Sequence, residues 1–130
     1  MIYLDSSVAL AHLLSEDRVP PAELWEEPLV SSRLIHYEVW NRIHGYGLAG
    51  SHGEAARALL ARLSLLELTP YVLARALEPF PQGVRTLDAL HLASVEFLRN
   101  RGQQILVATY DGRMRDAAKA LGYPTYPLAD

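Results

Sequence analysis

Short apolar runs alternate along this chain with longer segments in which apolar residues recur every three or four positions. Such short runs are typical of buried strands, and the longer period is typical of helices. After the first run, for example, Val8, Leu10, Ala11 and Leu14 recur at helical intervals. The strands that we expect cover residues 2–4, 29–31, 65–68, 105–108 and, near the end of the chain, 125–128. The expected helices cover residues 7–15, 22–27, 32–46, 51–63, 71–77, 86–101 and 113–121.

The alternation of strands and helices predicts the fold class. Short strands separated by helices favour an α/β fold, in which a mostly parallel sheet of five strands lies between helical layers as a three-layer sandwich. The clearest loop, residues 79–83, is a local break rather than a linker between domains. Since 130 residues match the commonest domain size, we expect a single domain over residues 1–130.

Composition narrows the class of protein. Half of the residues are hydrophobic and 21% are charged, as in an ordinary soluble globular protein. The chain has no cysteine, which excludes disulfides, thiolate metal sites and thiol nucleophiles and favours a reducing cytoplasm. No basic leader precedes the first apolar run, and no stretch approaches the roughly 20 apolar residues that cross a bilayer, so we expect no membrane association.

Charge restricts how a polyanion could bind. The net charge is −3, so the chain lacks the global positive field that is typical of proteins that coat nucleic acids. Its basic residues are arginines apart from Lys119, and the planar guanidinium group suits bidentate phosphate contacts as well as surface ion pairs. A nucleic acid would therefore have to be bound locally.

Four acidic residues lie where the pattern predicts proximity or burial. Asp5 and Asp111 each follow an expected strand directly, so in a parallel sheet both would project from the same edge. Glu38 lies beside the apolar stripe of its helix, and Asp88 lies in the first turn of a helix that is apolar around nearly its whole circumference. The stripe beside Glu38 is expected to consist of Ile35, Val39, Ile43 and Tyr46.

Each of these acids also has an ordinary structural explanation. Asp5 could cap the first helix, and Asp111 with the glycine after it could form only a turn. Glu38 could pair with Arg42, and Asp88 could favour the positive end of its helix. The acids at one edge are harder to explain together, because neighbouring carboxylates repel each other unless a cation relieves the repulsion. Oxygen ligands without cysteine favour Mg²⁺ or Mn²⁺, and such an ion would support metal-assisted hydrolysis.

Four short segments carry a resemblance to a known family. The sequences IYLDSS, IHYEVW, RTLDALHLA and ATYDGRM, in this order and spacing, are similar to the motifs of the PIN-domain family, in particular to the VapC-type toxins of toxin–antitoxin systems. The resemblance covers essentially the whole chain, and DALHLA with its upstream arginine is its most specific part. It implies a sheet in which the first strand lies beside the fourth, and a Mg²⁺- or Mn²⁺-dependent endoribonuclease. It also implies a homodimer and a cognate VapB-type antitoxin as partner.

The resemblance assigns roles to the acids by motif position. Asp5, Glu38 and Asp88 look like the principal catalytic and metal-binding acids, with Asp111 as a fourth acid that in this family can act through water. Ser6 looks like the family's hydroxyl residue that supports the outer shell of the metal, and capping of the first helix is an equally good explanation.

Other polar and aromatic residues near the motifs have two readings each. His91 accompanies Asp88, and a packing role in the helix is favoured over that of a general base. Trp25 and Trp40 could stack on bases, although a core or dimer contact is the safer interpretation. Four arginines near the motif acids could form a cationic rim that binds RNA phosphates, although ion pairs on the surface explain each of them equally well. The candidate rim residues are Arg42, Arg85, Arg113 and Arg115.

Several alternatives to a toxin ribonuclease remain open at this stage. The chain could be a PIN nuclease that processes RNA without being a toxin, or a PIN-like binding module without activity, although retention of all four acids argues against the latter. A phosphatase with an aspartyl nucleophile would need a second carboxylate two residues after Asp5, where Ser7 stands. Cleavage of RNA with Mg²⁺ or Mn²⁺ would separate a nuclease from the last two classes, and a small neighbouring gene for a DNA-binding antitoxin would favour a toxin over another nuclease.

Overall fold

The computed structural model describes residues 1–129. Within this range the strands are β1 (Ile2–Leu4), β2 (Leu29–Ser32), β3 (Ser64–Leu66) and β4 (Leu106–Ala108). The helices are α1 (Ser6–Leu13), α2 (Leu34–Gly45), α3 (Ala49–Ala61), α4 (Pro70–Ala76), α5 (Thr86–Asn100) and α6 (Gly112–Ala120). A short 3₁₀ helix, η1 (Ala22–Glu26), replaces the α-helix expected over residues 22–27.

The strands form one parallel sheet in the order β3-β2-β1-β4. The expectation that the first strand lies beside the fourth is therefore confirmed, with Ile2 paired to Leu106. The expectation of five strands is wrong, because residues 125–128 contribute only an isolated bridge between Thr125 and Val107. Pro124, directly before this segment, and Pro127, within it, lack the N–H that a longer strand would donate.

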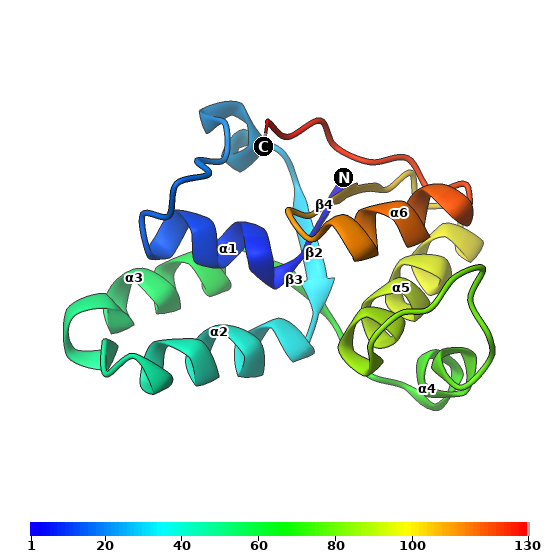
Figure 1. The fold of residues 1–130 in the computed structure, drawn as a ribbon, viewed down its shortest axis with the longest axis horizontal. Coiled ribbons are helices and arrows are strands. Elements are labelled where there is room, and N and C mark those ends of the chain that lie inside the picture. The colour runs from blue at the N-terminus through cyan, green and yellow to red at the C-terminus, as the bar shows by residue number, and fades with distance from the viewer. Residues whose placement is uncertain (130) are drawn as a thin grey trace.

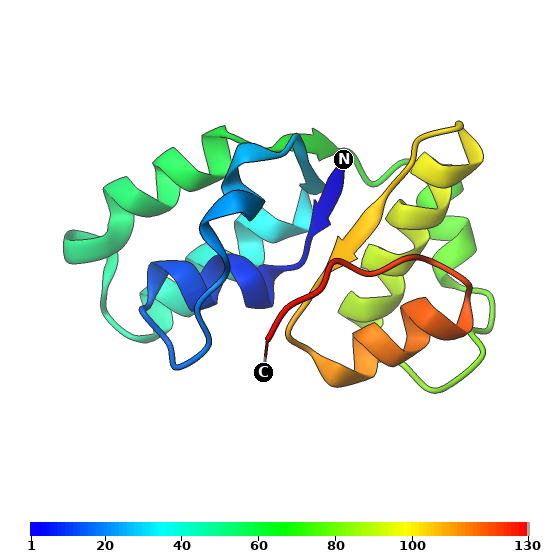
Figure 2. The same ribbon diagram turned by 90° about the horizontal axis from the view of Figure 1, so that it is seen from above.

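Helices cover both faces of the sheet and make the expected three layers. Helices α1, α2 and α3 lie on one side, and α4, α5 and α6 lie on the other (Figures 1 and 2). Leu4 is buried on the first side with Ile35 of α2, and Tyr3 is buried on the second side with Leu92 of α5. Strand β1 is thus covered on both faces, which explains why its sequence is continuously apolar.

One residue of the expected apolar stripe lies outside the core. Ile35, Val39 and Ile43 of α2 are fully buried, but Tyr46 is 60% exposed. The prediction failed at Tyr46 because α2 ends at Gly45 and Tyr46 occupies its C-cap position. The described residues contain no helix whose length and apolarity would allow it to cross a membrane.

Candidate active site

The site begins where two neighbouring parallel strands end. Asp5 follows β1 and Asp111 lies three residues beyond the end of β4, so both residues leave the sheet at the same edge. The backbone N–H of Asp5 donates a hydrogen bond of 3.0 Å to the carbonyl of Ala108, the last residue of β4. The sheet therefore fixes the positions of these two acids relative to each other.

All four acids predicted from the sequence line one cavity of about 600 Å³. Each acid comes from a different part of the fold: Asp5 from the end of β1, Glu38 from α2, Asp88 from α5 and Asp111 from the start of α6. Residues that are far apart in the sequence thus meet at one place. The lining further includes Ser6, Ser7, Leu10, Glu16, Arg18, Arg42, Arg85, Thr86, Leu87 and Tyr110.

Asp5 is oriented by two hydroxyl groups. Its side chain is buried, and its Oδ2 accepts hydrogen bonds from the hydroxyls of Ser7, at 2.6 Å, and Thr109, at 2.8 Å. Asp5 occupies the N-cap position of α1, yet its side chain makes no capping hydrogen bond. The carboxylate is therefore held between a hydroxyl of α1 and the hydroxyl that follows β4, and not by the backbone N–H groups of the helix. Sequence reasoning missed Ser7 and Thr109 as supports, and their positions next to Asp5 and Asp111 were the only signal.

Glu38 is held by side chains from two other helices. Its Oε2 accepts a hydrogen bond of 3.1 Å from the hydroxyl of Ser6, and its Oε1 lies 2.6 Å from Nε2 of His91. The ion-pair partner of Glu38 within residues 1–129 is thus His91 rather than Arg42. The Ser6 hydroxyl donates to Glu38, and Asp5 occupies the N-cap position of α1, so Ser6 does not cap this helix; its support of a metal stays a prediction.

His91 links Glu38 to the central strand. The imidazole is 1% exposed, and its Nδ1 lies 2.7 Å from the Tyr3 hydroxyl. The expected packing role is present, but the absence of a recognisable partner in the sequence was misleading, because both ring nitrogens have one. Burial alone would lower the pKa of His91, but the Tyr3 hydroxyl and the Glu38 carboxylate together raise it well above its ordinary value.

Asp88 combines burial with repulsion. It is 8% exposed and accepts a hydrogen bond of 3.4 Å from the backbone N–H of Arg85, at the N-terminus of α5. Burial, followed by repulsion from Asp111 and Asp5, raises the pKa of Asp88. The hydrogen bond at the helix N-terminus lowers the pKa of Asp88 but does not offset burial and repulsion.

Asp111 caps α6 and lines the cavity at the same time. Its Oδ1 accepts hydrogen bonds from the backbone N–H groups of Arg113, at 2.9 Å, and Met114, at 3.3 Å. The turn considered as an alternative is thus the N-terminus of a helix. The capping bonds fix the carboxylate near Asp88, which it repels.

The structure separates the four candidate rim arginines. Arg42 and Arg85 line the cavity, whereas Arg113 and Arg115 lie on α6 and are not among the described residues that line it. Sequence reasoning missed Arg18, which lines the cavity and donates a hydrogen bond of 3.0 Å to the carbonyl of Tyr110. Arg18 belongs to no motif, so only the fold could reveal its position.

The donor set fits a hard dication in charge and in chemistry. Five carboxylates face three arginines in the cavity lining, so negatively charged side chains outnumber positively charged ones there. Among residues 1–129, however, no group of three or more histidine, aspartate or glutamate side chains is arranged to hold a metal ion. Mg²⁺ commonly binds through one or two carboxylates and keeps several waters, so the cavity is compatible with such an ion.

Comparison with known proteins agrees with this architecture. The profile of the PIN domain matches residues 2–120. The chain is 39% identical to Ribonuclease VapC46 of Mycobacterium tuberculosis, over 93% of this chain and 92% of that protein. It is 31% identical to Ribonuclease VapC47 of the same species, over 96% of this chain and 95% of that protein.

Two solved structures share the fold at low sequence identity. One is a toxin–antitoxin complex from Klebsiella pneumoniae, with a TM-score of 0.71, 14% identity and full coverage of both chains. The other is the crystal structure of VapC20 of M. tuberculosis, described as a sarcin-ricin loop cleaving toxin, with a TM-score of 0.61 and 20% identity over 90% of this chain and 95% of that chain. This chain belongs to the PIN-domain family and, within it, to the VapC-type members.

Proposed function

We propose that this protein is a metal-dependent endoribonuclease that hydrolyses RNA phosphodiester bonds and acts as the toxin of a VapBC-type toxin–antitoxin system. The observation that carries the proposal is the convergence of Asp5, Glu38, Asp88 and Asp111 on one cavity. Support also comes from two relatives that are named ribonucleases, and from a neighbour in fold that is described as a toxin–antitoxin complex.

Each acid has a role in this proposal. Asp5, Glu38 and Asp88 would supply ligands to Mg²⁺ or Mn²⁺, one or two of them directly and the rest through bound water, and Asp111 would act through water. When bound, the ion would supply a water of lowered pKa and a positive charge opposite the phosphodiester. The hydroxyls of Ser7 and Thr109 fix the orientation of the Asp5 carboxylate, and Ser6 and His91 fix that of Glu38.

The cations of the cavity would act on the substrate. Arg42 and Arg85 can contact non-bridging phosphate oxygens, so that a polyanion can enter a cavity that is otherwise acidic. The same excess of negative charge makes the cavity a receptor for a basic side chain of a VapB-type antitoxin, whose arginine would compete with both metal and RNA. A homodimer and a cytoplasmic location are further parts of the proposal, by analogy with the family.

Cleavage of RNA in vitro tests the proposal directly. The wild-type protein should cut single-stranded RNA in the presence of Mn²⁺ or Mg²⁺ and should lose this activity in EDTA. Asp5→Asn and Asp88→Asn should each reduce the rate by at least about 100-fold, because even the outer-shell partners of metal ligands contribute 10- to 100-fold.

Asp116→Asn is the matched control, since Asp116 is an exposed carboxylate on α6 and should retain the wild-type rate. Activity that persists in EDTA, or in both site variants, would contradict the proposed site. Expression in a bacterial host tests the toxin role: growth should stop with the wild type and not with Asp5→Asn, and co-expression of the small protein encoded next to this gene should restore it.

A further inference from the structure

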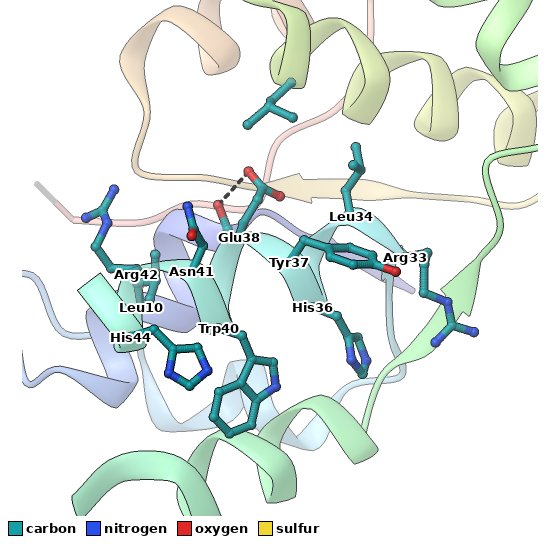
Figure 3. A pocket seen from close by; sticks show the side chains of 12 residues that line it. Leu10, Arg33, Leu34, His36, Tyr37, Glu38, Trp40, Asn41, Arg42 and His44 are labelled. Atoms are coloured by element: carbon teal, nitrogen blue, oxygen red, sulfur yellow. Dashed lines mark hydrogen bonds between the residues drawn. The ribbon is translucent and has the colours of Figure 1, made fainter. Parts of the chain in front are cut away.

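A second groove, of about 750 Å³, runs beside the acidic cavity along α2. We call it the α2 groove; it is lined by Ser6, Leu10, Arg33, Leu34, His36, Tyr37, Glu38, Trp40, Asn41, Arg42, His44 and Leu87 (Figure 3). The groove and the cavity share five lining residues: Ser6, Leu10, Glu38, Arg42 and Leu87. A molecule bound at the acids can therefore extend along α2 without leaving a concave surface.

The α2 groove differs from the cavity in charge. The cavity lining contains five carboxylates and three arginines, whereas the groove lining contains one carboxylate, Glu38, and two arginines. Arg33 is paired with Glu67 at 2.9 Å, so Arg42 at the junction carries most of the unshared positive charge. If the reacting phosphate of a polyanion lies at the acids, the rest of the chain is repelled less in the α2 groove than in the remainder of the cavity.

Planar side chains line the groove, and of its tyrosine and tryptophan side chains Tyr37 is the exposed one. Figure 3 shows the rings of His36, Trp40 and His44 leaving α2 on the side away from the Glu38 carboxylate. Trp40 is already stacked on His44, with ring centroids 5.6 Å apart, and packs against the core. Tyr37, by contrast, is 68% exposed. An exposed aromatic ring beside Glu38 is a surface on which a flat ligand can stack.

We propose that the α2 groove binds an unpaired nucleotide of the RNA substrate next to the reacting phosphate, with its base stacked on Tyr37 and its backbone near Arg42. The proposal rests on the proposed ribonuclease function and adds a substrate-positioning residue outside the four acids: Tyr37, which would hold a base of the unpaired strand. Paired bases in a duplex are stacked on each other and cannot present a face to Tyr37. A tyrosine ring accepts any base, so the contact favours unpaired RNA without selecting its sequence.

Binding of RNA without cleavage tests this proposal. The probe is a fluorescein-labelled single-stranded RNA of mixed sequence, titrated with protein in EDTA and followed by fluorescence anisotropy. Tyr37→Ala should raise the Kd for the single strand by about tenfold, the effect of losing one stacked base, and Tyr37→Phe should bind like the wild type. The affinity for a blunt RNA duplex should be the same for the wild type and Tyr37→Ala.

Tyr71→Ala is the matched control, because Tyr71 is 78% exposed on α4, outside both the groove and the cavity. It should bind single-stranded RNA as the wild type does. Equal affinities of Tyr37→Ala and Tyr71→Ala would overturn the proposal, and so would a Tyr37→Ala variant that binds RNA normally but loses an antitoxin, which would assign the groove to a protein partner.

The two proposals can fail separately in this design. If the wild type cleaves RNA while Tyr37→Ala binds it normally, the groove assignment is wrong and the ribonuclease function stands. If the wild type binds single-stranded RNA in a Tyr37-dependent way but cuts none with Mg²⁺ or Mn²⁺, the groove assignment stands as a binding surface and the ribonuclease function is wrong. Absence of any RNA binding by the wild type overturns the groove assignment.

Discussion

At the scale of single residues, His91 is the clearest case of a side chain whose chemistry depends on its neighbours. It joins the strand that carries Asp5, the helix that carries Asp88 and the acid Glu38, because Tyr3 and Glu38 occupy its two ring nitrogens. The sequence motif indicates only a histidine one turn after Asp88. Its partners lie 88 and 53 positions away in the chain, so no local pattern could identify them.

The raised pKa of His91 predicts how stability depends on pH. In the unfolded chain the histidine titrates near pH 6.5, and in the folded protein its pKa lies well above that value. The protonated imidazole therefore stabilises the fold fully below about pH 6.5, and this stabilisation is lost as the pH rises through the folded-state pKa. The free energy of unfolding, measured by urea denaturation in EDTA from pH 6 to pH 9, should fall with pH by up to about 1.4 kcal/mol per unit.

The variant His91→Gln should remove most of this slope, because glutamine can hydrogen-bond to Glu38 but does not titrate. His52→Gln, on α3 and away from the acids, serves as the matched control and should keep the wild-type slope. A His91→Gln protein whose stability falls with pH as steeply as that of the wild type would show that the titration of another group sets the slope.

At the scale of elements, the strand ends were predictable and the contacts between them were not. Alternating strands and helices predicted a parallel sheet, and the sheet brings Asp5 and Asp111 to one edge as expected. The prediction of a fifth strand was wrong, because Pro124 and Pro127 flank the single bridge at Thr125 and prevent a longer ladder. The hydroxyl of Thr109 forms hydrogen bonds to the side chain of Asp5 and to the backbone N–H of Asp111. These contacts depend on the register of β1 and β4, which the spacing of residues in the sequence does not determine.

Thr109→Val tests this connection between the two strands. Thr109 is 2% exposed; its hydroxyl donates to Asp5 at 2.8 Å and accepts from the backbone N–H of Asp111 at 3.0 Å. Valine keeps the shape of the side chain but leaves both partners without these hydrogen bonds. The free energy of unfolding should therefore fall by about 1–3 kcal/mol. If Asp5 binds the metal as proposed, the cleavage rate should fall about tenfold, the smaller effect of removing a group that orients a metal ligand.

The matched control for Thr109 is Thr125→Val, which changes the same side chain at the isolated bridge to β4. Its cleavage rate should equal that of the wild type. Thermal melting and single-turnover cleavage of an RNA oligonucleotide measure the two effects independently. If Thr109→Val cleaved RNA at the wild-type rate, the hydroxyl would be a purely structural group, and the orientation of Asp5 would have to come from Ser7 alone.

At the scale of the whole molecule, an acidic protein has to bind an acidic substrate. The net charge is −3, and the cavity itself has more carboxylates than arginines. In the proposed function, the net charge would therefore not attract RNA from a distance, and the local cations would have to make the phosphate contacts. The sequence predicted a rim of arginines, and the fold directs Arg42 and Arg85 into the cavity while adding Arg18, which no motif marked.

Salt dependence measures how many of these contacts form. For single-stranded RNA, each phosphate contact adds about 0.7 to the slope of log affinity against log salt concentration, because it releases a condensed counterion. Arg42 lines both the cavity and the α2 groove, so Arg42→Gln should weaken binding and reduce the slope by about that amount. Anisotropy titrations in EDTA from 50 to 300 mM KCl give the slopes.

Arg101→Gln is the matched control, because the Arg101 guanidinium lies over the Phe97 ring at 4.8 Å and lines neither the cavity nor the groove. This variant should keep the wild-type slope. Equal slopes for Arg42→Gln and the wild type would mean that the backbone of the RNA follows a path away from the junction between cavity and groove, past Arg18 or Arg85 instead.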